Sequence, residues 1–248
     1  QGSAVSIDNK TGRVVAIVGG RSQETEGYSL NRAYQSFRQP GSSIKPLVIY
    51  TPALEEGYDA NSTLTEIDVK AAKKSTSEKI SKMSGKKMSL RYAVEDSKNG
   101  CAYSLYNIIT PKVGLSYIEN MNFSKIVQQD YTLSSGLGGL HHGTNTVEMA
   151  NAYSTLENHG EYRQADCISS ILDASGNEIY EEPESKTVYT RSASDQMTDI
   201  LEGVLNSSAG TAKGLKWSSA SDVAAAAKTG TTNDNNVAWF CGYTPNYA

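Results

Sequence analysis

Three short motifs combine the residue types needed to cleave an amide through a serine ester. They are, in chain order, Ser42-Ser43-Ile44-Lys45, Ser97-Lys98-Asn99 and Lys228-Thr229-Gly230-Thr231. A serine hydroxyl is a weak nucleophile until a base takes its proton, and a desolvated lysine amine can be that base. The set predicts a serine acyl-transfer site in which lysines replace a catalytic histidine.

The letter patterns of these motifs do not identify the site, because each pattern occurs again elsewhere in the chain. The place of each motif relative to the predicted helices and strands identifies it instead. The repeats are Ser84-Gly85-Lys86-Lys87, Ser29-Leu30-Asn31, Ser175-Gly176-Asn177 and Lys10-Thr11-Gly12. Ser42 begins an apolar helical pattern, where free backbone amides and the helix dipole favour a reacting hydroxyl. Lys45 lies three residues on, so both side chains share one helix face. The structural alternative is a helix cap at Ser42 and a surface lysine at Lys45.

The second and third motifs supply groups that can handle a proton and hold a peptide. The Ser97 hydroxyl can relay a proton, and the Asn99 amide can bind a peptide group; both lie where a helical pattern breaks. The third motif ends an Ala-rich strand, and its glycine lets a ligand approach. Lys228, Thr229, Gly230 and Thr231 therefore predict a carboxylate-binding strand end. The alternatives are a helix C-terminal turn and a strand that runs into a polar turn.

Composition excludes several other classes of site. A net charge of -4 argues against a nucleic-acid partner. Three cysteines without a Cys-x-x-Cys and three histidines predict neither a disulfide framework nor a metal site, and we expect no cofactor. Cys101 is interpreted as a packed thiol beside the cleft. No apolar run is long enough to span a bilayer, and no signal peptide is recognised. We expect a cytosolic protein or, because no closing element precedes Ala248, an excised domain.

The periodicity of apolar residues predicts strands at both ends and helices between them. Residues 4–8 and 14–18 predict a hairpin, and a helix from Ser42 should kink or end near Pro52. The other predicted elements are helices at 89–98, 103–109, 145–156 and 197–205, a hairpin at 162–180, and strands at 224–228 and 237–243. Residues 60–88 carry seven lysines and predict a solvated loop or helix face. The predicted fold is α+β, with an antiparallel sheet built from both terminal segments and a mostly helical insert.

Longer stretches of the chain resemble one protein family. The stretches are 30–33, 38–46, 138–140, 147–153, 228–235, 238–240 and 242–245. With the three motifs, they resemble the transpeptidase domain of class A penicillin-binding proteins, the bifunctional cell-wall synthases. The resemblance covers essentially the whole chain and implies a β-lactamase/transpeptidase-like fold over residues 1–248. It also implies an upstream glycosyltransferase domain and membrane anchor, a last strand and helix beyond Ala248, and a location on the extracytoplasmic face of a bacterial membrane.

The resemblance implies a D,D-transpeptidase mechanism for peptidoglycan stem peptides. Ser42 would be acylated by a donor that ends in D-Ala-D-Ala, and an amine of an acceptor stem would then take the acyl group. The implied roles are general base for Lys45, proton shuttle for Ser97 with help from Lys228, donor binding for Asn99, and carboxylate binding for Thr229 and Thr231. The backbone amides of Ser42 and Thr231 would form the oxyanion hole, and β-lactams would acylate Ser42.

Several alternatives remain open on the same residues. A D,D-carboxypeptidase differs only in letting water compete with the amine. A class A β-lactamase would have a glutamate with an asparagine four residues later; between the second and third motifs this spacing occurs at Glu202 and Asn206. A non-turnover β-lactam sensor would keep Ser42 and Lys45 for acylation alone. A Ser/His/Asp hydrolase could use His141-His142, but the chain has no Gly-x-Ser-x-Gly elbow.

Overall fold

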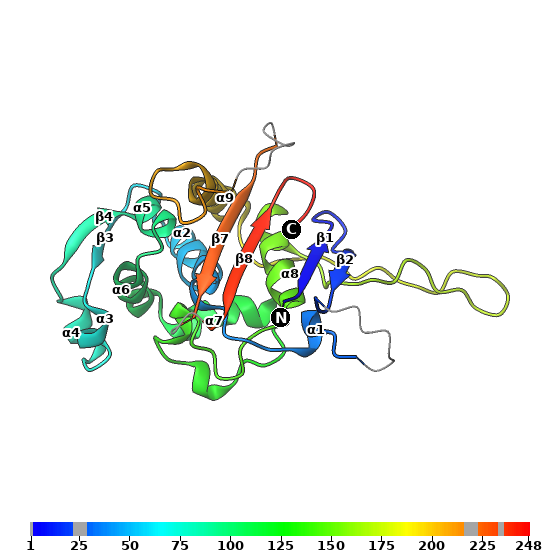
Figure 1. Ribbon diagram of the computed structural model, residues 1–248, viewed down its shortest axis with the longest axis horizontal. Coiled ribbons are helices and arrows are strands. Elements are labelled where there is room, and N and C mark those ends of the chain that lie inside the picture. The colour runs from blue at the N-terminus through cyan, green and yellow to red at the C-terminus, as the bar shows by residue number, and fades with distance from the viewer. Residues whose placement is uncertain (1, 22–28, 216–222, 233–235) are drawn as a thin grey trace.

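The computed structural model describes residues 2–21, 29–215, 223–232 and 236–248 (Figure 1). The strands are β1 Ala4–Ile7, β2 Val14–Val18, β3 Thr63–Glu66, β4 Lys86–Ser89, β5 Glu161–Tyr162, β6 Lys186–Thr187, β7 Ala226–Thr231 and β8 Ala238–Tyr243. The α-helices are α1 Arg32–Gln35, α2 Thr51–Glu55, α3 Val69–Ala72, α4 Ser77–Ser81, α5 Leu90–Glu95, α6 Asn99–Ile109, α7 Pro111–Asn120, α8 Thr146–Glu157 and α9 Arg191–Asn206. The tighter or wider turns are η1 Gly41–Ile44, η2 Pro46–Tyr50, η3 Gln128–Asp130 and η4 Ser135–Leu137. None of these described helices is both long and apolar enough to cross a bilayer.

Antiparallel strands come from both ends of the chain, as predicted. β1 pairs with β2, and β7 pairs with β8 from Ala226↔Tyr243 to Thr231↔Ala238. The two hairpins lie side by side (Figure 1), but the described strands form separate two-stranded sheets. A cavity of 590 Å³ lies between β1 and β8. The last residue, Ala248, lies beside the end of β1, where Ile7 and Ala248 exchange two backbone hydrogen bonds of 2.8 and 3.0 Å. The mixed helix and strand prediction is therefore confirmed, with paired hairpins in place of one continuous sheet.

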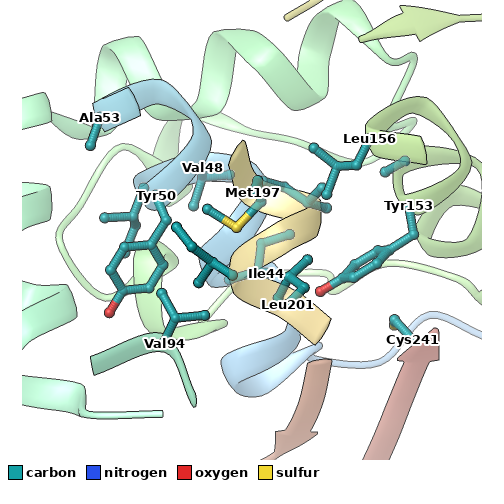
Figure 2. Packing of buried hydrophobic residues seen from close by; sticks show 14 of the residues in the cluster. Ile44, Val48, Tyr50, Ala53, Val94, Tyr153, Leu156, Met197, Leu201 and Cys241 are labelled. Atoms are coloured by element: carbon teal, nitrogen blue, oxygen red, sulfur yellow. The ribbon is translucent and has the colours of Figure 1, made fainter. Parts of the chain in front are cut away.

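The core surrounds the helical segment that follows Ser42. Ile44 and Val48 of this segment pack among Met197 and Leu201 of α9 and Leu156 of α8, all buried (Figure 2). The apolar stripe predicted for α9 is confirmed, since its buried residues recur at helical spacing. In α8 the whole run 151–156 is buried, so this helix is enclosed on all sides at its C-terminal half. The start of α8 is closed by a capping box, in which Asn145 accepts from Glu148 N–H and the Glu148 side chain accepts from Asn145 N–H. The segment that carries Ser42 and Lys45 is thus held on several sides by packed helices.

Two prolines change the predicted helix into three short segments. In an α-helix the amide of residue 46 would bond to Ser42 O, but proline has no N–H. The Lys45 N–H bonds to Ser42 O instead, which makes η1 a 3-10 turn. Thr51 N–H then reaches back to Pro46 O, so η2 is a π-turn. This wide turn leaves Leu47 O for the buried Tyr189 hydroxyl, which donates to it at 2.7 Å. The prediction of one helix with a break near Pro52 is therefore wrong at its start, because Pro46 already sets the geometry.

The second motif lies between two helices, not after one. α5 ends at Glu95 and α6 begins at Asn99. The helix predicted for 89–98 therefore ends three residues earlier than predicted, and the break falls at residues 96–98. The helix predicted for 103–109 is confirmed and starts earlier.

The lysine-rich segment is more regular than predicted. β3 and β4 form an antiparallel hairpin, with α3 and α4 between them. All seven lysines are exposed, which confirms the solvated face. The segment packs against α6 through Ile67, Ala72, Ile80 and Tyr103.

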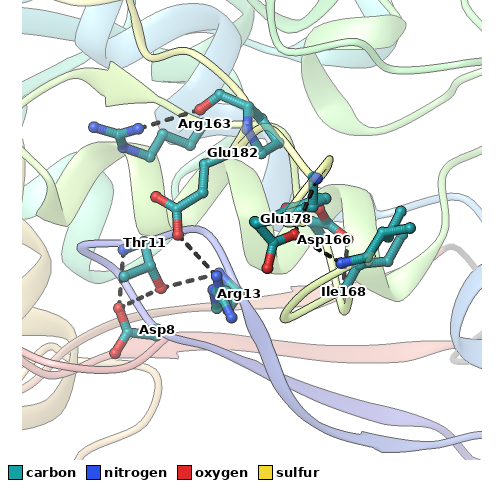
Figure 3. A network of polar contacts seen from close by, with 11 residues as sticks. Asp8, Thr11, Arg13, Arg163, Asp166, Ile168, Glu178 and Glu182 are labelled. Atoms are coloured by element: carbon teal, nitrogen blue, oxygen red, sulfur yellow. Dashed lines mark hydrogen bonds and ion pairs between the residues drawn. The ribbon is translucent and has the colours of Figure 1, made fainter. Parts of the chain in front are cut away.

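Residues 163–186 form an arm that projects from the body beside β2 (Figure 1). The hairpin predicted for 162–180 is only partly confirmed: Tyr162 pairs with Lys186, and Leu172 and Glu178 form an isolated bridge at the tip. Polar contacts tie the base of the arm to the β1–β2 turn, including an Arg13–Glu182 ion pair at 2.8 Å (Figure 3). Few apolar side chains are buried along the arm, so pairing is local.

Candidate active site

The 3-10 turn at Ser42 sets the geometry of the first motif. In such a turn, residues three apart fall on the same side, so the Ser42 and Lys45 side chains leave the segment on one face. Ser42 is partly exposed, whereas Lys45 is fully buried. The segment therefore offers a hydroxyl to a ligand and keeps the amine below it away from water.

Lys45 reaches from the first motif to the second. Its Nζ donates to Ser97 O at 2.8 Å and to Asn99 Oδ1 at 2.7 Å, and Ser97 Oγ lies at 3.5 Å. A neutral amine has two N–H donors and one lone pair, and the two short bonds use both donors. The lone pair is then available to accept a proton.

Lys228 reaches the same serine from β7. Its Nζ donates to Ser97 Oγ at 2.9 Å and to Thr229 O at 3.1 Å. Like Lys45, Lys228 is fully buried, so the Ser97 hydroxyl lies between two amines that water cannot solvate. The three motifs predicted from the sequence therefore meet at one point.

Burial changes the proton affinity of both amines. Desolvation holds the pKa of Lys45 well below its usual value, and the charge of Lys228 lowers it further. Desolvation also lowers the pKa of Lys228, to about 8. Two buried ammonium groups around one hydroxyl repel each other, so one of the pair gives up its proton more readily than a surface lysine.

Ser97 holds a backbone conformation that usually belongs to glycine. Its φ is 56°, in the left-handed region. Ser97 N–H bonds to Val94 O at 3.1 Å and Lys98 N–H to Ala93 O at 2.8 Å, the two hydrogen bonds of a Schellman motif that ends α5. The tight reversal aims the Ser97 hydroxyl at Lys45 and Lys228. A strained residue at a cluster of buried amines is typical of a functional site.

Lys45 fixes the orientation of the Asn99 amide. An ammonium or amine N–H can only donate, so the Asn99 oxygen must face Lys45 and the Asn99 NH₂ must face away. That NH₂ is a donor at the start of α6, free to meet a carbonyl oxygen. The structure thus brings the predicted ligand-binding amide to Ser97 and Lys45.

Two glycines allow the strand and the Ser42 turn to touch. Gly41 has a φ of 55°, and a Cβ there would lie 2.5 Å from Thr231 O. A Cβ on Gly230 would lie 2.4 Å from Pro40 O and 2.9 Å from Ser43 N. Contacts below 3.0 Å force atoms apart, so neither position accepts a side chain without movement. This close approach brings the amides of Ser42 and Thr231 to the same end of the cluster.

Thr229 has a partner that the sequence did not indicate. Its hydroxyl lies 2.6 Å from the hydroxyl of Thr211, which follows α9. Thr211 N–H in turn bonds to Glu95 O at 3.2 Å, which ties it to the end of α5. A Gly-Thr pair after a helical stripe is the sequence signal that could have drawn attention to this residue.

Other contacts were also missed, and the repeated motifs are elsewhere. Tyr153 donates to Ser43 O at 2.7 Å, and Glu66 accepts from Gly100 N–H at 3.1 Å beside Asn99. An acidic residue two positions after the buried Leu64 in β3 was the available signal for Glu66. The repeat Ser84-Gly85-Lys86-Lys87 spans the start of β4, and Lys10-Thr11-Gly12 lies in the β1–β2 turn; both are apart from the cluster. The 590 Å³ cavity is also separate, since Ser42, Lys45, Ser97 and Lys228 do not line it.

Other chemistries predicted or excluded from the sequence can now be located. Cys101 is buried, as predicted, and burial with the nearby Glu66 raises the pKa of its thiol to about 12. His141 and His142 are exposed in a loop. Within the described ranges, no three His, Cys, Asp or Glu side chains gather where they could hold a metal ion.

Comparisons with known proteins agree with this geometry. The family model "Penicillin binding protein transpeptidase domain" matches residues 2–248. Penicillin-binding protein 4 of Bacillus subtilis is 32% identical over 248 residues, which are 100% of this chain and 39% of that protein. Penicillin-binding protein 1F of the same organism is 33% identical over 99% of this chain and 34% of its own length. The chain therefore spans little more than a third of these relatives.

Solved structures show the same fold. PonA1 of Mycobacterium tuberculosis, in complex with penicillin V, superposes with a TM-score of 0.78 at 22% identity and covers 99% of this chain and 67% of its own. The D,D-transpeptidase domain of a peptidoglycan glycosyltransferase from Eggerthella lenta gives a TM-score of 0.75 at 18% identity, with 99% and 70% covered. Because the family model matches nearly every residue, this chain belongs to the penicillin-binding protein transpeptidase domain family.

Proposed function

We propose that this domain is a serine D,D-transpeptidase that forms an acyl-enzyme at Ser42 with a stem peptide ending in D-Ala-D-Ala. The observation that supports this most is the position of the Ser97 hydroxyl, 3.5 Å from Lys45 Nζ and 2.9 Å from Lys228 Nζ. One hydroxyl between two buried amines provides a proton path from a nucleophile to a leaving group. Family membership supports the same reaction class.

Each residue has a definite task in the proposed acylation. Ser42 Oγ attacks the carbonyl carbon of the penultimate D-Ala, and Lys45 Nζ accepts the hydroxyl proton. The amides of Ser42 and Thr231 stabilise the oxyanion, for which one donor is typically worth about 3 kcal/mol. The C–N bond then breaks, and the proton passes from Lys45 through Ser97 Oγ to the leaving nitrogen of D-Ala.

The remaining groups bind the donor and complete the transfer. The Asn99 NH₂ donates to a donor peptide carbonyl, while Lys228, Thr229 and Thr231 hold the terminal carboxylate on the strand that Gly230 allows to contact the Ser42 turn. An amine of a second stem then attacks the ester, and its proton returns to Ser42 by the reverse path. A C–N bond replaces the ester, and no cofactor takes part.

Labelling with a fluorescent penicillin tests the nucleophile. We expect covalent label on Ser42, because a β-lactam presents a strained amide and a carboxylate to the same groups. Ser42→Ala should reduce labelling by at least about 1,000-fold. Ser84→Ala is the matched control, since Ser84 begins the second Ser-x-x-Lys and is exposed. Label that survives Ser42→Ala, or is lost in Ser84→Ala, would overturn the assignment.

Incubation with a D-Ala-thioester stem analogue and an amine separates transpeptidation from the alternatives on this fold. A transpeptidase gives the amide product, a carboxypeptidase gives only the free acid, and a sensor is acylated without releasing either product repeatedly.

We further propose that the chain is one domain of a longer, membrane-anchored protein with a glycosyltransferase domain at the outer face of a bacterial membrane. Its small share of its relatives' length and the name of the E. lenta protein support this.

A further inference from the structure

One acidic side chain lies behind the cluster on an element that carries none of the three motifs. Glu66 ends β3, and it shares a face with the buried Leu64 because side chains alternate along a strand. β3 lies against α6, where the Ser104 hydroxyl donates to Thr65 O at 3.0 Å and Gly100 N–H donates to Glu66 Oε1 at 3.1 Å. Glu66 is therefore fixed to the first turn of the helix that begins with Asn99.

The contact with Gly100 satisfies one backbone amide at a helix end whose N-cap side chain makes no capping hydrogen bond. The first amides of a helix lack partners within it, and the Lys98 side chain makes no capping hydrogen bond to α6. A carboxylate at this end also interacts favourably with the helix dipole. A Cβ on Gly100 would lie 2.2 Å from Ile67 O, so the helix turn and the strand lie as close as backbones allow. Movement of Glu66 would move Asn99.

The charges around Lys45 give Glu66 a second role. The groups that act on the Lys45 amine are Lys228 on β7, Cys101 on α6 and Glu66 on β3. Burial and the Lys228 charge lower the pKa of Lys45, whereas the Glu66 charge raises it. Burial and Glu66 raise the pKa of Cys101 to about 12, so this thiol stays neutral.

None of the other groups that the structure describes near Glu66 supplies a negative charge to Lys45 in its place. Burial, chiefly, raises the pKa of Tyr50 well above its usual value, so its phenol is neutral. Lys98 is paired with Asp96 at 2.7 Å, and Lys86, opposite Glu66 in the β3–β4 register, is exposed to solvent. Among the described residues that act on Lys45, Glu66 is thus the carboxylate that offsets two buried amines.

We propose that Glu66 is a positioning residue, whose carboxylate holds the first turn of α6 in place for Asn99 and balances the positive charge of the Lys45–Lys228 pair. The proposal rests on the proposed function, because its kinetic consequence is the rate of Ser42 acylation. A base that is too weak takes a serine proton poorly, so the carboxylate keeps the Lys45 amine basic enough to act.

Two substitutions separate the charge from the reach of this side chain. Glu66→Gln keeps an oxygen for Gly100 N–H and removes the charge, whereas Glu66→Asp keeps the charge and shortens the side chain. Removing the negative charge of Glu66 lowers the pKa of Lys45, so this amine stays unprotonated down to a lower pH. We therefore expect the acid limb of the pH–rate profile for acylation to move down by on the order of one pH unit in Glu66→Gln. Its plateau should fall several-fold. Glu66→Asp should lower the plateau and leave the limb near its wild-type pH.

Glu78→Gln is the matched control, because Glu78 is an exposed carboxylate in the same lysine-rich segment, paired with Lys82 at 2.6 Å. This control should change neither limb nor plateau. A limb that stays in place in Glu66→Gln, or moves equally in Glu78→Gln, would overturn the proposal. A plateau that falls without a shift also overturns it, because a purely structural role would produce that result.

A second readout does not depend on acylation. The midpoint of the Lys45 titration can be followed by NMR in protein labelled with ¹³C at lysine Cε, with Lys45→Arg used to assign the signal. We expect a lower midpoint in Glu66→Gln than in the wild type. If the wild type is not labelled by penicillin, the proposed function fails, yet this titration still decides whether Glu66 acts on Lys45.

Discussion

Ser97 combines two unfavourable features at the scale of one residue. Its backbone has a φ of 56°, and its hydroxyl lies between two buried amines. The left-handed region costs a non-glycine residue roughly 1–2 kcal/mol, and glycine escapes this cost. A glycine would satisfy the Schellman motif better but would remove the hydroxyl. At this position, stability favours glycine, whereas the proposed chemistry requires serine.

Paired substitutions at Ser97 measure that opposition. Ser97→Gly and Ser97→Ala both lose the hydroxyl, so their difference reports the backbone alone. We expect Ser97→Gly to be more stable than Ser97→Ala by about 1 kcal/mol, a melting temperature roughly 2–4 °C higher. Thermal and urea unfolding measure this, and penicillin labelling should fall equally in both. Equal stability of the two variants would show that the left-handed backbone carries no strain.

At the scale of elements, the site depends on how closely η1 and β7 approach. Gly230 on β7 leaves no space beside Pro40 O and Ser43 N, at 2.4 and 2.9 Å from an added Cβ. Tyr153 of α8 and Tyr189 before α9 fix the other side of this segment through Ser43 O and Leu47 O. The 3-10 and π turns expose these carbonyls, so the packing helices and the irregular segment depend on each other.

Gly230→Ala tests the approach of η1 and β7. The added methyl must push the strand from the Ser42 turn, which we expect to cost about 1–3 kcal/mol of stability and to slow labelling by at least about tenfold. Gly214→Ala is the control, because no atom of the described residues lies within 4 Å of its added Cβ and its φ needs no glycine. It should leave labelling unchanged. Equal effects of the two substitutions on labelling would contradict the role of the close approach.

The sequence predicted the elements that depend on a simple period and missed the contacts that depend on tertiary packing. The stripe of α9 and the strand β8 follow from spacing, and β7 does so with its bounds shifted by two to three residues. The break in the Ser42 helix was predicted near Pro52, but the missing N–H of Pro46 already rearranges the hydrogen bonds of the segment. Glu66 and Thr211 were missed because each acquires a role only through a residue on another element.

At the scale of the whole molecule, distant parts of the chain supply one site. Lys45, Ser97 and Lys228 meet at a single hydroxyl, although Ser97 and Lys228 are 131 residues apart. The buried core around η1 and η2 holds these parts together, because it draws residues from α5, α6, α8, α9, β7 and β8. The arm at 163–186 lies outside this core (Figure 1).

Because the arm at 163–186 projects from the body, we expect that the backbone can be cleaved at its tip while the residues of the site stay together. Gly176 is at its exposed tip, and nothing lies within 4 Å of an added Cβ there. A specific protease site inserted at Gly176 should give two fragments that remain associated under native conditions and still react with penicillin. On a denaturing gel the label should stay with the N-terminal fragment, which contains Ser42, while Lys228 migrates in the other. Loss of labelling on cleavage would show that the arm must be continuous for the site to form.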